Sequence, residues 1–235
     1  MPFGAHTTPK LLPLVNRYGS TGRYVILCVE TYLVDKTVNK NTLASRRTKQ
    51  NILDSSVAIL GLEGYSALTT SKLSGHAKIS KGALYHHFSN LDEVKYATLE
   101  YLVESFNTIT DPQKFAELSG YLAVTENLLF SNMKEQPIMM KALYAFIAEA
   151  MFDDKKKYQL QKLFRNSMDT YFKAVKHFYP DLSSEQLTSI VQVIDAYFTG
   201  AVIHWYLLDD PKQCRANWNM FSSMLLGMLP GRKIV

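Results

Sequence analysis

The sequence predicts an all-α protein in which a small domain of three helices precedes a larger helical domain. Apolar residues recur at helical spacing along most of the chain after residue 45. Prolines stand where helices should begin, at positions 112, 137 and 211. Residues 23–34 are β-branched and aromatic, but no second candidate strand follows to pair with them. A chain of 235 residues is long enough to bury the cores of two domains.

The charge distribution points to a phosphate-binding surface near the N-terminus. The net charge is +5, and residues 1–45 and 46–95 each carry a net +3, so residues 96–235 are close to neutral. Cys28 and Cys214 are far apart and have no metal-binding or disulfide pattern, which fits a reducing cytosol. The longest apolar run is shorter than the ~20 residues of a membrane span. We therefore expect a cytoplasmic protein without a membrane segment.

Residues 1–45 lie outside the helical pattern and have two interpretations. Residues 1–22 are rich in Pro, Gly, Thr and Ser and show no period. The extension is either a poorly ordered basic arm that adds phosphate contacts, or sequence upstream of a native start near Val38. We favour the second interpretation slightly.

Residues 46–60 form the first predicted helix, which Gly61 and Gly64 should end. Its inward face follows the helical period and comprises Ile52, Leu53, Ser56, Val57 and Leu60. The basic residues at its start are Arg46, Arg47 and Lys49. They suit a solvated helix end and an arm on DNA phosphates equally well.

Residues 69–88 predict two short helices joined by a turn. Thr70 should cap the first helix and Ser80 the second, at residues 81–88. A small core would take Leu73, Ala77, Ile79, Leu84 and Phe88. The second helix would then present one cation, two small residues and three polar aromatic tips: Lys81, Gly82, Ala83, Tyr85, His86 and His87. Such a helix can enter a DNA groove, read base edges and hold phosphates.

The run SKGALYHHF at residues 80–88 resembles the DNA-binding domain of the tetracycline-repressor (TetR) family of regulators. The resemblance includes the flanking stretches at residues 52–68 and 90–102. It implies a helix-turn-helix DNA-binding domain at residues 46–93 and a ligand-binding and dimerisation domain at residues 94–235. The implied DNA-binding residues are Arg46, Arg47, Thr70, Ser80, Lys81, Gly82, Ala83, Tyr85, His86 and His87.

Within that surface, we expect Lys81 and Ala83 to read base edges, and Tyr85 and His87 to hold phosphates. Lys78 occupies a turn position where the family usually has glycine. If its φ is positive, lysine costs about 1 kcal/mol more than glycine.

Six further helices are expected after the helix-turn-helix, which gives nine in all. The first, residues 91–109, is capped by Ser89 and Asn90 and has Asp92 and Glu93 in its first turn. The others span residues 115–133, 138–151, 153–179, 185–208 and 212–229.

The last two predicted helices are apolar on more than one face, which favours a two-fold dimer built as a four-helix bundle. The expected interface residues are Phe198, Val202, Trp205, Phe221 and Leu225. The alternative is that both faces form core within one chain.

The middle helices are rich in Met and aromatic residues, a pattern more often found in a core than in a ligand pocket. The family resemblance implies a pocket there, with Asn127 and Glu149 as further polar candidates. Its expected ligand-binding residues are Met133, Met140, Tyr144, Met168, Tyr171, His177 and His204. We expect an apolar, aromatic ligand, because an anion buried there would lack a paired cation. A cationic aromatic compound also fits.

The chain contains no Gly-rich phosphate loop, nucleophile elbow or zinc spacing, so no enzyme activity, cofactor or metal is expected. The favoured function is a dimeric repressor released from its operator by a small molecule. The alternative is a TetR-like DNA-binding adaptor or structural protein with no inducer, which engages another protein. A cavity of at least ~300 Å³ among the middle helices would favour the first, and a filled core the second.

Overall fold

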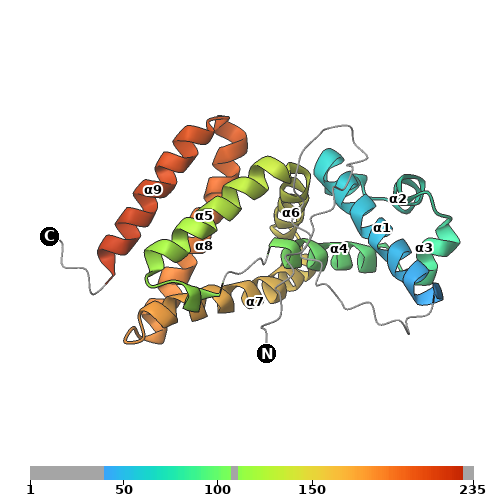
Figure 1. Ribbon diagram of the computed structural model, residues 1–235. Coiled ribbons are helices and arrows are strands. Elements are labelled where there is room, and N and C mark those ends of the chain that lie inside the picture. Colours follow the sequence, from blue (N-terminus) through green and yellow to red (C-terminus); the bar gives the residue numbers. More distant parts are fainter. Residues whose placement is uncertain (1–39, 107–110, 230–235) are drawn as a thin grey trace, which may run out of the picture.

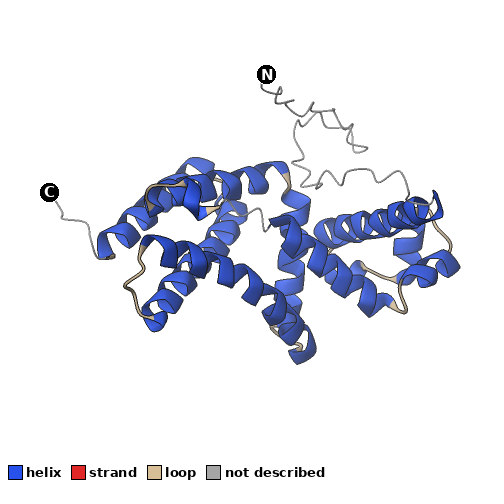
Figure 2. Ribbon diagram, turned by 60° about the horizontal axis from the view of Figure 1, so that its bottom comes forward, coloured by secondary structure: helices blue, strands red, loops and turns tan. Residues whose placement is uncertain are grey.

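The computed structural model describes residues 40–106 and 111–229, and every regular element in these ranges is helical (Figures 1 and 2). There are nine α-helices, as expected. They are α1 (Lys40–Glu63), α2 (Thr70–Ala77), α3 (Lys81–His87), α4 (Leu91–Phe106), α5 (Leu118–Glu135), α6 (Pro137–Ala150), α7 (Asp154–Phe178), α8 (Ser184–Leu208) and α9 (Pro211–Met228). Helices α1–α3 form an N-terminal unit at one end, and α8 and α9 lie at the opposite end (Figure 1). The expectations for residues 1–39 lie outside the described residues.

The N-terminal unit is held together by one small core and by side-chain caps. Leu73, Leu84 and Phe88 are almost completely buried, as the sequence predicted. Thr69, rather than Thr70, caps α2, since its side-chain oxygen accepts a hydrogen bond from the backbone N–H of Lys72 at 3.3 Å. Ser80 caps α3 in the expected way and accepts from the N–H of Ala83 at 3.0 Å.

The turn between α2 and α3 contains the left-handed residue that the sequence raised as a possibility. Lys78 has φ 55° and ψ 44° and ends α2. Its N–H donates to the carbonyl of Gly75 at 3.3 Å, and the side-chain amide of Asn51 on α1 donates to the carbonyl of Ala77 at 2.7 Å. The end of α2 is thus fixed from two sides, which stabilises a conformation that costs lysine about 1 kcal/mol relative to glycine.

Helix α4 connects the N-terminal unit to the rest of the molecule, and its start is capped as predicted. The side-chain oxygen of Asn90 accepts from the N–H of Glu93 at 2.9 Å, and the Glu93 carboxylate accepts from the N–H of Ser89 at 2.6 Å. The hydrogen bonding from Ser89 lowers the pKa of the Glu93 carboxyl group. A helix of this length spans roughly 24 Å at ~1.5 Å per residue, enough to join the two units.

Helices α1 and α5 differ clearly from the sequence prediction in where they begin or end. Helix α1 begins at Lys40 instead of residue 46, and it continues through Gly61. Helix α5 begins at Leu118 instead of residue 115, because Pro112–Lys114 forms a separate 3₁₀ turn and Phe115 and Glu117 are extended. Prolines 137 and 211 do open α6 and α9, and a capping box at Ser183 starts α8.

Gly61 does not end α1 but permits a close approach between α1 and α6. A Cβ atom on Gly61 would lie 2.2 Å from the carbonyl oxygen of Ile138. Nearby, the ring of Tyr65 lies between the ammonium groups of Lys95 and Lys156, at 4.4 and 4.8 Å from the ring centre. The N-terminal unit therefore contacts both α4 and α6.

The core of the larger unit is aromatic. Trp218 is almost completely buried, and its ring packs against those of Tyr197, Phe198 and Phe221. Phe130 of α5 packs on Trp205 of α8, so this core joins α5, α8 and α9.

Candidate nucleic-acid interface and ligand pocket

Helix α3 separates a buried face from an exposed one. Leu84 is 1% exposed, whereas Lys81, Gly82, Tyr85 and His86 are exposed. Ala83 and His87 are partly exposed. The outward face thus contains the residues that the sequence assigned to it, and their cation, hydroxyl and imidazole groups are the types that contact phosphates and base edges.

The hydroxyl of Tyr85 is held by a neighbouring helix. It lies 3.1 Å from the side-chain oxygen of Thr70, the first residue of α2, and either group can be the donor. A hydroxyl can donate and accept at once, so the pair keeps hydrogen-bonding capacity for a phosphate. Two predicted DNA-contact residues from different helices are therefore brought together.

The remaining predicted contact residues differ in their surroundings. The Ser80 hydroxyl caps α3. A Cβ atom on Gly82 would meet only that hydroxyl, at 3.7 Å, so the fold does not require glycine there. Arg46 and Arg47 are exposed, but they lie within α1 instead of in an arm before it. Any contact they make with DNA must come from the side of that helix.

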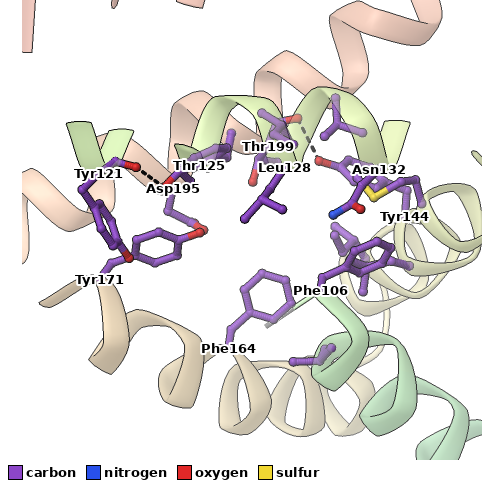
Figure 3. Close-up of a pocket in the computed structure, with 17 residues that line it drawn as sticks. Phe106, Tyr121, Thr125, Leu128, Asn132, Tyr144, Phe164, Tyr171, Asp195 and Thr199 are labelled. Atoms are coloured by element: carbon purple, nitrogen blue, oxygen red, sulfur yellow. Dashed lines mark hydrogen bonds between the residues drawn. The ribbon is translucent and has the colours of Figure 1, made fainter. Parts of the chain in front are cut away.

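A cavity of about 180 Å³ lies among α4, α5, α6, α7 and α8 (Figure 3). Its walls are mostly apolar and aromatic. The lining residues are Val103, Phe106, Tyr121, Thr125, Leu128, Leu129, Asn132, Met140, Leu143, Tyr144, Ile147, Phe164, Tyr171, Asp195, Phe198, Thr199 and Val202. The cavity is smaller than the ~300 Å³ at which ligand pockets usually begin, yet the core there is not filled.

Three of the seven predicted ligand-binding residues line this pocket: Met140, Tyr144 and Tyr171. Met133 and Met168 pack in the core beside it, and His177 and His204 are exposed. The two further polar candidates also lie elsewhere, since Asn127 is exposed and Glu149 pairs with Lys156 at 3.0 Å. Neither Asn127 nor Glu149 lines the cavity.

The polar groups of the pocket are supplied mainly by residues that sequence analysis did not single out. The Tyr144 hydroxyl donates to the backbone carbonyl of Thr199 at 2.9 Å. Burial raises the pKa of Tyr144 and of Tyr171, which keeps both phenols neutral. Burial also raises the pKa of Asp195, the one carboxyl group among the lining residues. The available signal was that Asp195 is the one acidic residue of α8 beyond its first turn.

The five predicted dimer residues are already packed within the chain. Phe198 and Val202 line the pocket, Phe221 stacks on Tyr197 with ring centres 4.0 Å apart, and Trp205 packs on Phe130. Leu225 is buried. The exposed apolar side chains of the same helices include, besides Leu208 at the end of α8, three on α8 and three on α9: Val193, Ile203, Leu207, Met220, Met224 and Met228. We call these six the α8/α9 surface.

Within the described residues, α8 alone has the length and composition of a membrane span, a criterion that core helices of globular proteins also meet. It packs against α7 and α9. No group of three His, Cys, Asp or Glu side chains in the described part of the chain could hold a metal ion.

A helix-turn-helix with an exposed second helix, joined to a larger all-α unit, is an architecture typical of DNA-binding transcription regulators. Residues 52–94 match the family model described as bacterial regulatory proteins, tetR family. The resemblance read from the sequence is thereby confirmed: this is a regulator with the TetR fold. No curated protein matches the sequence significantly.

Solved structures agree with this fold at low sequence identity. A TetR transcription regulator from Haloarcula marismortui is 18% identical, with a TM-score of 0.63 over 78% of this chain and 99% of that one. FadR from Bacillus subtilis, solved with stearoyl-CoA, is 15% identical, with a TM-score of 0.63 over 77% and 98%. The multidrug-binding protein EbrR, solved with imidazole, is 19% identical, with a TM-score of 0.56 over 79% and 97%.

Proposed function

We propose that this regulator is a dimeric repressor that leaves its operator when a small molecule binds in the α4–α8 pocket. The observation that carries the proposal is the path between the two sites. Val103 and Phe106 of α4 line the pocket, and the same helix begins directly after the recognition helix α3. Helix α6 also lines the pocket, and it touches α1 at Gly61.

In this proposal α3 enters the major groove, Lys81 and Ala83 contact base edges, and Tyr85 and His87 hold phosphates. The hydrogen bond between Tyr85 and Thr70 supports the phosphate role, because it orients the hydroxyl before DNA arrives. We expect Tyr85→Phe to weaken binding to all duplexes alike, and Lys81→Ala to lower the preference for the operator. A uniform loss of affinity in both variants would contradict this division of roles.

A second copy is proposed to cover the α8/α9 surface. Gly200 lies between Val193 and Ile203 on α8, and a Cβ atom there would meet nothing within 4 Å, so another helix has room to approach. A two-fold dimer formed through this surface would present two copies of α3, as two half-sites require.

Ligand binding would change operator affinity through α4 and α6. A molecule that binds the DNA-free conformation more tightly than the DNA-bound one shifts the population toward the DNA-free conformation. The size of the shift is set by the difference between the two binding free energies. The usual coupling is about 1–3 kcal/mol, or roughly 5- to 150-fold in operator affinity.

The dimer and its operator affinity can be tested together. Ile203→Glu places a charge on the α8/α9 surface, and we expect monomers by sedimentation and at least a hundred-fold loss of affinity for a duplex selected from a random library. Met151→Glu is the control, because Met151 is also apolar and exposed but lies at the end of α6, outside that surface. A wild-type monomer at micromolar concentration would contradict the proposal.

The small cavity volume favours one alternative, a DNA-binding adaptor of the same fold that has no inducer and engages a protein. This alternative expects that no compound in a broad thermal-shift panel stabilises the protein. The repressor proposal instead expects at least one compound that both raises Tm and releases DNA.

A further inference from the structure

The α4–α8 pocket contains one acidic side chain and no basic one among the described residues that line it. Asp195 is that acid, and all other lining residues are apolar, aromatic or neutral polar. Asp195 is half-buried, and an opposite charge offsets the desolvation of such a carboxylate. In the part of the chain that the structure describes, no hydrogen bond or ion pair engages the Asp195 carboxylate.

Two tyrosines of the pocket interact electrostatically with Asp195 but are unsuited to neutralise its charge. Tyr144 and Tyr171 both feel its negative charge, and both remain neutral phenols. The Tyr144 hydroxyl already donates its proton to the carbonyl of Thr199 at 2.9 Å. The Asp195 carboxylate therefore keeps free acceptor capacity on the wall of the cavity.

The pocket has distinct ends. Figure 3 shows Asp195 on the side where Tyr121 and Tyr171 lie, with Phe164 and Leu128 between that side and Asn132. The ring of Tyr171 lies 5.9 Å from that of Phe198, so aromatic surface adjoins the carboxylate. Aromatic faces attract cations, and a carboxylate accepts hydrogen bonds from an ammonium group.

We infer that the pocket binds a compact organic cation, an amine with a single aromatic ring whose ammonium group contacts Asp195. This inference deepens the proposed function, on which its regulatory meaning rests. A cavity of about 180 Å³ is a little larger than the ~150 Å³ that holds one benzene molecule, so one ring with a short amine chain fits. Carboxylates and phosphates would bring a second negative charge beside Asp195 without a cation.

The test is calorimetry with three probes of similar size: 2-phenylethylamine, 2-phenylethanol and phenylacetate. At neutral pH the first is a cation, the second neutral and the third an anion. We expect the wild type to bind the amine at least ten-fold more tightly than the alcohol, and the anion most weakly. Asp195→Asn, which keeps the shape and removes the charge, should weaken amine binding by about ten- to hundred-fold and leave alcohol binding unchanged.

Asp169→Asn is the control, because Asp169 lies on α7, is exposed and does not line the pocket. It should bind all three probes as the wild type does. Alcohol binding by Asp195→Asn verifies that the variant is folded. Equal affinities for amine and alcohol in the wild type, an amine preference that survives in Asp195→Asn, or no binding of any probe would each overturn the inference.

Operator release, followed by fluorescence anisotropy with the same probes, separates this inference from the proposed function. Amine binding that depends on Asp195 but leaves DNA bound would support the inference and contradict the repressor proposal. Release of DNA by the alcohol and the amine alike would support the repressor proposal and contradict the inference about Asp195.

Discussion

The N-terminal unit and the larger unit differ in how they divide structural and functional work. In α3, Leu84 is buried in the core while Lys81 and Tyr85 on either side of it are exposed. In the α4–α8 pocket, Tyr144 and Val202 are packed in the protein and line the cavity at the same time. One unit separates its fold-forming residues from its proposed contact residues, and the other uses the same residues for both.

This difference has a consequence for mutation. On α3, a substitution can remove a proposed DNA contact without exposing any core surface. In the pocket, a truncated wall residue both enlarges the cavity and removes packing, so ligand affinity and the free energy of unfolding should change together.

The largest expected effect is a difference in the free energy of unfolding between variants at a buried and an exposed position of α3. Leu84→Ala should lower the free energy of unfolding by about 2–5 kcal/mol, because a large side chain that is 1% exposed is removed from the small core. Lys81→Ala should change it by less than about 0.5 kcal/mol, since its side chain is exposed. Urea unfolding of both variants measures the contrast. Comparable losses would show that α3 does not separate the two roles.

The contact between the two units is expected to be the next most sensitive point. Gly61→Ala would place a Cβ atom 2.2 Å from the Ile138 carbonyl, so α1 and α6 must move apart, at about 1–3 kcal/mol. Gly75→Ala on α2 is the control, because a Cβ atom there meets nothing within 4 Å. Urea unfolding should show a loss for the first variant alone. Unchanged stability in Gly61→Ala would mean that the junction adapts at no cost.

The same contrast explains which features could be predicted from sequence. Caps, helix count and the exposed face of α3 depend on neighbouring residues, and the Ser80 cap, the Asn90 cap and the burial of Leu84 are all confirmed. The pocket depends on five helices, from Val103 to Val202. Helical spacing marks Met133 and Met140 equally as buried, but only their packing decides that Met140 meets the cavity and Met133 does not.

Gly61 shows the same limit at the junction. From the neighbouring residues alone, a glycine near a predicted helix end is interpreted as the end of that helix. Gly61 instead allows the close approach of α6, which is distant in sequence.

A smaller effect is expected at Gly82, where one substitution should raise stability and weaken DNA binding. Gly82→Ala should raise the free energy of unfolding by about 0.5–1 kcal/mol, because alanine favours a helix and the site has room for a Cβ atom. It should also weaken operator binding, on the order of ten-fold, because the added methyl group holds α3 away from the groove. Thermal unfolding and fluorescence anisotropy on one preparation test both effects. Unchanged operator affinity would mean that the backbone at Gly82 does not approach DNA.

The smallest expected effect concerns the pocket, where ligand-binding capacity and stability should oppose each other at Asp195. Burial raises the pKa of this carboxyl group, so at neutral pH the folded ligand-free protein holds a charge that the unfolded chain solvates better. Asp195→Asn removes that cost and should raise Tm in the absence of ligand. Each 1 kcal/mol of stability corresponds to roughly 2–4 °C in Tm for a chain of this size.

The pH dependence of that gain identifies its cause. As the pH falls through the raised pKa, the folded wild type takes up a proton before the unfolded chain does, so its stability increases relative to the Asn variant. The difference in Tm should therefore shrink as the pH falls toward 3.8, the ordinary pKa of the group. Asp169→Asn, at an exposed position, should show no such trend. A lower Tm for Asp195→Asn at neutral pH would mean that the carboxylate has a stabilising partner without ligand, and the pocket would then not be poised for a cation.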